Sequence, residues 1–345
     1  MEKTAVIILN WNGVEHGLLR RYLPSVIEHT NPEVGEVIVA DNGSTDESLK
    51  VLHDEFPSVR VVALDQNYGF AEGYNRAIAQ MEHRYVLLLN DDVAVSPHWL
   101  EPLADYLDRH EEVLAVQPKL KSDRNRRMFE YAGAAGGFLD SLGYPYCRGR
   151  IFQTVEEDRG QYDTPCAIDW ATGACLMVRR EAYLKAGGLD SHFFAHMEEI
   201  DLCWRLRRMG GTLMCVPQSE VYHLGGASLG PENPRKTMLN FRNSLLMLYK
   251  NLPEAERRRT ILRRKLLDGV AALNFCAHLQ FGHAKAIWTA HREYARMVKE
   301  FYANAEEVAK RNSSHPEFAP AANQPLSILS HYYLKGHKTF SSINL

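Results

Sequence analysis

Tyr85-Val-Leu-Leu-Leu-Asn-Asp-Asp-Val93 is the stretch of sequence on which the fold depends. Its apolar run is short and bounded by polar residues, which is typical of a β-strand buried on both faces. Such a strand usually lies inside an α/β sheet, and these sheets bind ligands beyond the carboxyl ends of their strands. Asn90, Asp91 and Asp92 would then line a crevice, with oxygen atoms suited to Mg²⁺ or Mn²⁺. A simple turn at the strand end explains the same residues equally well, so the rest of the chain has to decide.

Strand and helix patterns alternate on both sides of this stretch. Residues 4–9 and 36–40 are β-branched and apolar, and each run precedes apolar residues at helical spacing. Ser44 followed by Glu47 forms a capping box that predicts a helix start, and Ser96-Pro97 predicts another. The alternation predicts an α/β domain with a mostly parallel central sheet flanked by helices.

Polar turns follow the other predicted strands as well. Asp41 ends the strand over residues 36–40, so it is expected on the same sheet edge as Asp92. Residues 10–13 form a polar turn after the first strand, and the glycines of residues 67–75 permit close approach of the backbone to a ligand. The latter segment has neither a Gly-x-Gly-x-x-Gly fingerprint nor a Walker lysine, so a dinucleotide site is not indicated.

A second polar cluster lies near the start of a predicted helix ending at about Met209. Glu198, Glu199 and Asp201 are three acids within four positions. Acids at a helix amino terminus are stabilised by the macrodipole, but three exceed what capping needs, which favours a functional role. His223 ends a later strand, and a lone histidine there is more often structural unless the fold brings it to Asp92.

The composition excludes several classes of protein. The 345 residues carry a net charge of −3, which gives no sign of nucleic-acid binding. The six cysteines have no Cys-x-x-Cys spacing, so we expect free thiols rather than structural zinc or disulfides. The amino terminus leads directly into a strand, and no apolar run reaches membrane-spanning length. We therefore expect a cytoplasmic protein.

Two regions lie outside the regular pattern. Residues 119–163 show no sustained period, which favours a binding loop or lid. We expect a catalytic domain over residues 1–250 and a helical extension over residues 251–345, with its long helical region ending at about Lys310. Basic clusters accompany an apolar side of that extension, which either lies on the inner face of an anionic membrane or packs on the catalytic domain. The apolar residues of that side are Ile261, Leu262, Leu266, Val270 and Leu273.

Taken together and in this order, the motifs resemble glycosyltransferase family 2, particularly its rhamnosyltransferase-like branch. The resemblance spans roughly the first 250 residues, and its specificity lies in the ordered coincidence of several motifs. It implies a single nucleotide-binding domain of the glycosyltransferase A type. The matching pieces are residues 6–12, 41–46, 67–75, 88–92, 170–174, 198–205 and His223.

The resemblance also implies a donor site. Asp41 looks like the acid that contacts the nucleotide base, with Asn10, Asn12, Gly69 and Asn75 in the turns beside it. It implies that the donor is a dTDP-, UDP- or GDP-linked sugar. Arg205, Arg235 and Lys236 are candidate diphosphate contacts, Arg205 equally an ion-pair partner of the helix acids.

A metal site and a base complete the implied set. Asn90-Asp91-Asp92 resembles the Asp-x-Asp motif, in which Asp92 matches the metal-binding acid and Asn90 replaces the first acid. His223 looks like the second protein ligand of Mg²⁺ or Mn²⁺. Glu199 falls where the family has its catalytic base, although that base is usually an aspartate, so Asp201 and Glu198 stay open alternatives.

The implied activity is metal-dependent, inverting transfer of a sugar to a hydroxyl group of a saccharide or lipid-linked saccharide, in cell-surface polysaccharide synthesis. A carboxylate-held divalent cation would neutralise the departing diphosphate, and a second carboxylate would take the proton of the attacking hydroxyl. The alternative is a catalytically inactive sugar-nucleotide-binding protein on the same fold.

Overall fold

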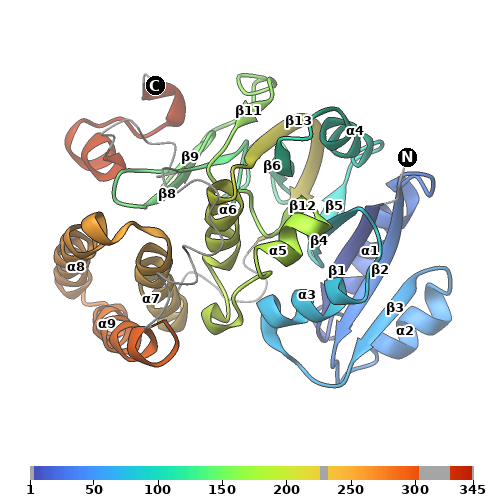
Figure 1. The fold of residues 1–345 in the computed structure, drawn as a ribbon, viewed down its shortest axis with the longest axis horizontal. Helices are drawn as coiled ribbons and strands as arrows, with labels where there is room; N and C mark the ends of the chain where they lie inside the picture. Colours follow the sequence, from blue (N-terminus) through green and yellow to red (C-terminus); the bar gives the residue numbers. More distant parts are fainter. Residues whose placement is uncertain (1–3, 226–231, 303–326, 344–345) are drawn as a thin grey trace.

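A computed structural model describes residues 4–225, 232–302 and 327–343, and its largest element is a nine-stranded sheet (Figure 1). Eight of its strands lie side by side, each hydrogen-bonded to the next, and the ninth, β5 (Val93–Val95), pairs with β13. In their spatial order across the sheet, the eight strands are β11 (Cys166–Ala167), β13 (Thr212–His223), β6 (Val113–Ser122), β12 (Cys175–Arg179), β4 (Tyr85–Asn90), β1 (Thr4–Asn10), β2 (Gly35–Asn42) and β3 (Arg60–Leu64).

The main pairings of this sheet are parallel. β1 runs parallel to β2 and β4, β2 to β3, and β6 to β13. β12 is inserted between β4 and β6 and runs antiparallel to both. The predicted α/β architecture with a mostly parallel central sheet is confirmed.

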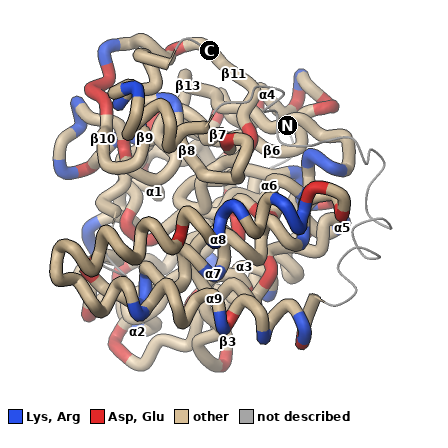
Figure 2. Tube along the Cα trace, turned by 90° about the vertical axis from the view of Figure 1, so that its left-hand side faces the viewer, with Lys and Arg blue, Asp and Glu red and all other residues tan. Residues whose placement is uncertain are grey.

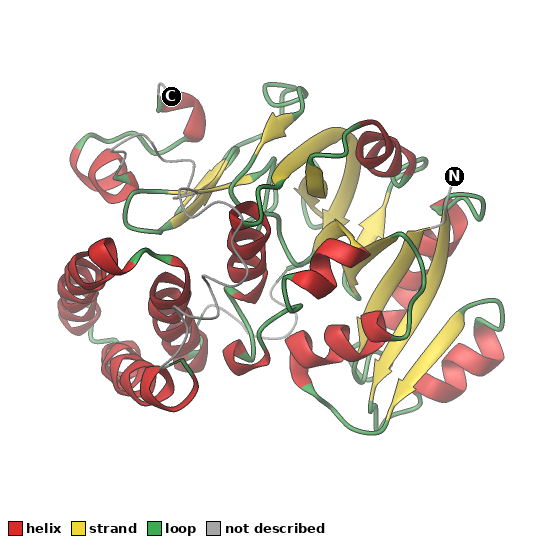
Figure 3. Ribbon diagram, viewed as in Figure 1, coloured by secondary structure: helices red, strands yellow, loops and turns green. Residues whose placement is uncertain are grey.

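Helices cover both faces of the sheet (Figure 3). In β4, Tyr85, Leu87 and Leu89 face one hydrophobic core, whereas Val86 and Leu88 face the other, because successive side chains of a strand point to opposite sides. The run of β4 is apolar throughout because both of its faces are buried in these two cores. One core contains α1 (Leu19–His29), α2 (Ser48–Glu55) and α4 (Glu101–Arg109), and the other α3 (Gly69–Ala79), α5 (Arg180–Lys185), α6 (Glu198–Arg208) and α7 (Pro234–Asn251).

Residues 119–163, for which the sequence predicts an irregular loop or lid, contain a second, four-stranded antiparallel sheet. Residues 327–343 cover this small sheet. The backbone N–H of Ile328 donates to Asp140, 3.1 Å away, and the ring of Phe340 packs 5.5 Å from that of Phe138. The strands are β7 (Gly137–Leu139), β8 (Pro145–Cys147), β9 (Arg150–Ile151) and β10 (Thr154–Val155).

α7, α8 (Glu254–Ala277) and α9 (Phe281–Phe301) pack together into a three-helix layer beside the sheet domain (Figure 1). The helical character of the region after residue 250 agrees with the prediction, and α9 ends before Lys310, which lies outside the described residues. The domain boundary at residue 250 stays a prediction. No helix in the described ranges is both long and apolar enough to span a lipid bilayer. All six cysteines are free, as expected.

Two predicted helix starts are wrong. Ser44 does not cap a helix: its hydroxyl accepts the backbone N–H of Asn12 at 2.9 Å, and α2 begins only at Ser48. Residues 93–95 form β5, the Ser96 hydroxyl donates to the Glu220 carbonyl at 2.8 Å, and α4 begins at Glu101. In both cases a tertiary contact takes the hydroxyl that local capping would have used.

Candidate active site

The carboxyl ends of β1, β2 and β4 meet at one edge of the sheet. The strand register places Asn10 opposite Asp41 and Leu9 opposite Asn90. The structure therefore brings together polar residues that are up to 80 positions apart in the chain (Asn10 to Asn90). This is the edge at which open α/β sheets bind ligands.

Hydrogen bonds hold the two turns that follow β1 and β2. The Asn10 side-chain amide donates to Asp41 Oδ1 at 2.8 Å, and the Ser44 N–H donates to Asp41 Oδ2 at 3.0 Å. Asn12 Oδ1 accepts the Thr45 N–H at 2.8 Å. Among the described residues, the buried Oδ1 of Asn10 has no partner, so it is available to a ligand donor.

Asn42, which the sequence did not single out, holds the turn before α3. Its amide donates to the carbonyl of Gly69 at 3.1 Å, and its Oδ1 accepts the Tyr68 N–H at 3.0 Å. Gly69 has φ of +75°, a conformation that glycine adopts without the strain of a Cβ atom. The only signal in the sequence was its place beside Asp41 at a strand end.

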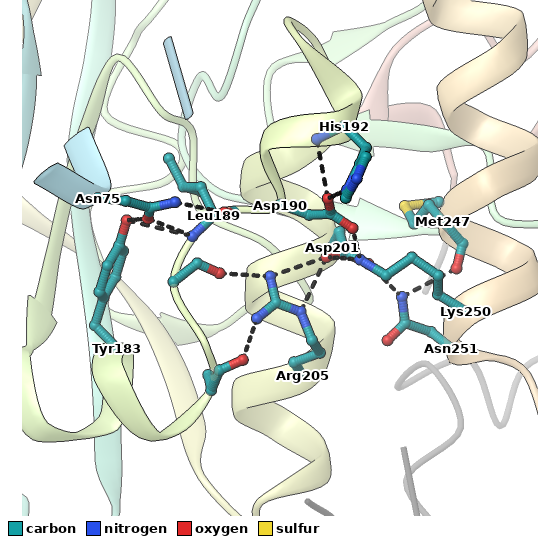
Figure 4. A network of polar contacts seen from close by, with 12 residues as sticks. Asn75, Tyr183, Leu189, Asp190, His192, Asp201, Arg205, Met247, Lys250 and Asn251 are labelled. Atoms are coloured by element: carbon teal, nitrogen blue, oxygen red, sulfur yellow. Dashed lines mark hydrogen bonds and ion pairs between the residues drawn. The ribbon is translucent and has the colours of Figure 1, made fainter. Parts of the chain in front are cut away.

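The Asn75 side chain, on α3, makes its hydrogen bonds inside the protein. Its amide donates to the Leu189 carbonyl at 2.8 Å, while its Oδ1 accepts the Tyr183 hydroxyl at 2.6 Å and the Leu189 N–H at 3.0 Å (Figure 4). These bonds fasten α3 to the segment that leads into α6. The side chain is used inside the protein, so its effect on a nucleotide would be indirect.

Asp92 and His223 form a close pair at the same edge. Asp92 Oδ1 lies 3.0 Å from His223 Nε2, because β5 pairs with the end of β13 and aligns His223 with Val93. Adjacent ligands of an octahedral ion at about 2.1 Å are themselves about 3 Å apart, so the pair fits one Mg²⁺ or Mn²⁺ ion. Within the described residues, no group of three or more His, Cys, Asp or Glu side chains could hold a metal. An ion here would therefore take its other ligands from water and phosphate oxygens, as Mg²⁺ commonly does.

Glu130 lies on the side of His223 away from Asp92, near the Nδ1 atom. Its Oε1 lies 3.4 Å from His223 Nδ1, and both side chains are buried. Burial lowers the pKa of His223, but the carboxylates of Glu130 and Asp92 outweigh burial and raise this pKa to about 10. A carboxylate on the far nitrogen of a ligating histidine is a common support for metal binding. Glu130 lies in the aperiodic region, where no sequence pattern marked it.

The two other residues of the Asn90-Asp91-Asp92 turn have different surroundings from Asp92. The Asn90 amide lies 3.5 Å from His223 Nε2, at the limit of a hydrogen bond. Asp91 lines a small pocket beneath α1, and burial together with the charge of Asp92 raises its pKa to about 7.

The chain that leads into α6 is strained. Phe194, His196 and Met197 have φ of 67°, 71° and 72°, the left-handed region that L-residues other than Asn and Asp rarely adopt. Such outliers persist only where the surrounding structure enforces them, and they concentrate at functional sites. They place Glu198 and Glu199 at the amino terminus of α6.

Glu199 is half-buried, and its Oε2 atom is shielded from solvent. Burial raises its pKa to about 7, although backbone N–H groups of the first turn of α6 act in the opposite direction. A Cβ atom at Gly173 would lie 3.7 Å from Glu199 Cβ, and the next residue, Ala174, accepts the Asn90 N–H at 3.0 Å. The segment 173–174 thus connects Glu199 to Asn90. Among the described residues, Glu199 Oε2 and Glu198 Oε2 have no hydrogen-bond partner.

Asp201 is in a different situation. It accepts hydrogen bonds from Arg205 at 2.9 Å, Lys250 at 2.7 Å and Asn251 at 2.8 Å, and its side chain is fully buried (Figure 4). Both carboxylate oxygens of Asp201 therefore have hydrogen-bond partners inside the protein. Arg205 also donates to the carbonyls of Ala186 and Gly188, which matches the alternative of an ion-pair partner rather than a diphosphate contact.

The other two candidate cations lie on α7. The guanidinium of Arg235 lies 5.0 Å from the ring centroid of Phe194. Burial lowers the pKa of Lys236, and the charge of Glu130 partly offsets this. The charge of Lys236 in turn adds to burial in lowering the pKa of His196 to about 4. Lys236 therefore interacts with groups on both sides of the site.

Comparisons with known proteins identify the family of this chain. The sequence profile described as "Glycosyl transferase family 2" matches residues 5–186. An N-acetylglucosaminyl-diphospho-decaprenol L-rhamnosyltransferase from Mycobacterium tuberculosis is 30% identical over 228 residues, which cover 61% of this chain and 73% of that protein.

Solved structures share the fold. A mannosyltransferase from Pyrobaculum calidifontis in complex with GDP-Man and Mn²⁺ has a TM-score of 0.52 at 14% identity, covering 85% of this chain and 87% of that one. GalNAc-T7 with UDP, GalNAc and Mn²⁺ has a TM-score of 0.53 at 20% identity, covering 65% of this chain but only 43% of that one.

Proposed function

Because the chain belongs to glycosyl transferase family 2 and is a glycosyltransferase, we propose that it is metal-dependent and inverts the transferred sugar. The donor is a nucleotide-diphospho-sugar, and the acceptor is a hydroxyl group of a saccharide or lipid-linked saccharide. The observation that carries this proposal is the pairing of Asp92 with His223, 3.0 Å apart at the sheet edge. Glu199 lies next to segment 173–174, which is hydrogen-bonded to Asn90 at the same edge.

Asp92 and His223 are the proposed metal ligands. A divalent cation bound there supplies positive charge to the departing diphosphate. Lys236 adds a protein cation near Glu130 and His223, and its lowered pKa reflects a half-buried position suited to a phosphate oxygen. Asp41 and the orphaned Oδ1 of Asn10 present acceptors to the base of the nucleotide.

Glu199 is the proposed general base. A carboxylate with a pKa of about 7 is largely deprotonated slightly above neutral pH and still basic enough to take the proton of an acceptor hydroxyl. The hydroxyl oxygen forms a bond to the anomeric carbon as the bond to the diphosphate oxygen breaks. The proton goes to Glu199 and the nucleotide diphosphate leaves, so one displacement inverts the anomeric centre without an enzyme nucleophile.

The name of one relative suggests which donors and acceptors to test. The M. tuberculosis relative is named for L-rhamnose transfer to a lipid-diphosphate-linked sugar, so we include dTDP-linked deoxyhexoses beside UDP- and GDP-linked donors. A lipid-linked acceptor would place the protein on the inner face of the membrane in cell-surface polysaccharide synthesis.

Release of nucleotide from a panel of sugar-nucleotides, measured with Mn²⁺ and saccharide acceptors, tests the proposal. We expect Asp92→Ala and Glu199→Gln each to lower kcat by at least roughly 100-fold. Asp105→Ala, at an exposed ion pair on α4, serves as the control and should keep wild-type activity. Undiminished transfer in both site variants would contradict the assignment. Mn²⁺-dependent nucleotide binding by the wild type without any turnover would favour the inactive sugar-nucleotide-binding protein.

A further inference from the structure

The outward face of α8 carries an unusual row of exposed apolar side chains. Leu262, Leu266, Val270 and Leu273 are spaced four, four and three residues apart, so they lie along one side of the helix. They are 61–72% exposed, although a soluble helix normally turns such a stripe towards the core. The buried face of the same helix contains Ile261 instead.

α9, which packs against α8, also carries exposed aromatic and basic residues. Phe281 and Trp288 are 61% and 59% exposed, and Lys285, Arg292 and Lys299 follow the same side of the helix at intervals of three, four or seven residues. The guanidinium of Arg292 lies 4.7 Å from the ring centroid of Trp288. Tryptophan and basic residues on one helix face are typical of helices that lie in a membrane interface.

The α8–α9 hairpin carries an excess of positive charge. Residues 254–301 contain ten Lys and Arg residues and five acids, whereas the whole chain has a net charge of −3. Arg257 and Arg264 are buried and do not contribute to the outer surface. Asp268 is buried and paired with His291 at 2.9 Å, so it does not neutralise the outer surface. In the described part of the chain, Arg258, Arg259 and Arg263 take part in no ion pair. Figure 2 shows α8 and α9 side by side on the face of the molecule turned to the viewer.

We infer that the outer face of the α8–α9 hairpin is a docking surface for an anionic lipid membrane. The apolar stripe and the two aromatic rings enter the headgroup region, and the flanking basic residues attract anionic lipids. A second copy of the chain is the less suitable occupant, because pairing this face with itself would bring two basic surfaces together. The inference uses no residue of the sheet edge and does not depend on the proposed transfer reaction.

Vesicle flotation with the full chain tests this inference. We expect binding to vesicles of equal parts phosphatidylglycerol and phosphatidylcholine at low ionic strength, and little binding to phosphatidylcholine alone. Replacing Arg258, Arg259 and Arg263 together by Gln should weaken the partition constant on the order of 100-fold, since each surface charge contributes about 1 kcal/mol. The double variant Leu266→Gln and Leu273→Gln should weaken it on the order of 100-fold, since each buried leucine contributes about 1.5 kcal/mol or more.

Matched controls separate the docking surface from general effects. Leu334→Gln removes an 83% exposed leucine elsewhere, and Lys50→Gln removes an exposed charge on α2, so both should bind like the wild type. Circular dichroism and Mn²⁺-dependent nucleotide binding should be unchanged in every variant. Absence of wild-type binding, equal binding to neutral vesicles, or unaltered binding by both hairpin variants would overturn the inference. A dimer in analytical ultracentrifugation that these variants dissociate would overturn it as well.

Discussion

Glu199 combines partial burial, a raised pKa and an unpartnered oxygen at the amino terminus of α6. A base must be deprotonated before it can act, so we expect kcat/KM to rise with pH through about 7 and then level off. In Glu199→Asp, which keeps a carboxylate on a shorter arm, a weaker ascending limb should remain. A pH–rate profile that is flat between pH 5 and 9, about two units on either side of that pKa, would argue against Glu199 as the base.

The same carboxyl group predicts an unusual stability effect. Its pKa rises from 4.5 to about 7 on folding, so its contribution to stability is fully present below pH 4.5 and is lost as pH rises through 7. Glu199→Gln has no charge to bury, so its advantage in free energy of unfolding should grow over that interval by on the order of 2–3 kcal/mol. Urea unfolding at pH 5 and pH 8 measures this. A difference in free energy of unfolding between variant and wild type that is the same at pH 5 and pH 8 would contradict the prediction.

Glu130 acts on the proposed metal site only through His223. Glu130→Gln leaves the imidazole without its carboxylate neighbour, so we expect Mn²⁺ affinity in titration calorimetry to fall by roughly 10- to 100-fold. Glu156→Gln, which alters a buried carboxylate in contact with Tyr162, is the matched control and should leave Mn²⁺ affinity unchanged. Equal affinities in the two variants would remove Glu130 from this role.

The predictability of single residues depended on the kind of neighbour they have. Asp41, Asn90 and Asp92 end strands of a parallel sheet, so the topology alone brings them to one edge. Asp201 lies only two positions after Glu199, but on a helix this spacing turns it to another side, towards Lys250 on α7. Glu130 meets His223 only through the irregular chain, and no local pattern encodes such a contact.

At the scale of elements, α6 and α7 are joined by a buried ion-pair network. Lys250 on α7 donates to Asp201 at 2.7 Å and to Asp190 at 2.6 Å (Figure 4). Lys250→Met leaves the buried Asp201 and the partly buried Asp190 without their common cation, so we expect a loss of about 3 kcal/mol in the free energy of unfolding. Arg20→Met, which breaks the exposed Arg20–Glu55 pair, should cost less than about 1 kcal/mol. Similar losses in the two variants would show that the network contributes little.

Elements were predictable where hydrophobic periodicity was strong. The alternation of β4 between two cores and the apolar spacing of α1 are local signals that the tertiary structure reinforces. The helix starts at Ser44 and Ser96 failed because distant partners, Asn12 and Glu220, take those hydroxyls. The strands β7–β10 are two or three residues long, too short for a period to be visible.

At the scale of the whole molecule, the nucleotide should bind only the folded protein, in which the sheet edge is assembled, and should therefore raise the free energy of unfolding. With Mn²⁺ present, the nucleotide diphosphate of the true donor should stabilise the protein by about 2.7 kcal/mol at about 100 times its Kd. A thermal-shift screen of dTDP, UDP and GDP identifies the base that the site accepts. In Asp92→Ala the Mn²⁺-dependent part of the shift should disappear, and a shift that persists would place the metal elsewhere.

The small sheet under residues 327–343 bears on how the protein is made. Asp140 receives its bond from Ile328, 188 positions later, and Ser341 reaches Glu156 across 185 positions. A ribosome adds about 5–20 residues per second, so β7–β10 wait roughly ten seconds or more for these partners after they emerge. During that interval the rings of Phe138 and Tyr146 lack the cover of Phe340 and are available to chaperones or to other nascent chains. This corner of the molecule is therefore completed well after the strands of the sheet edge have left the ribosome.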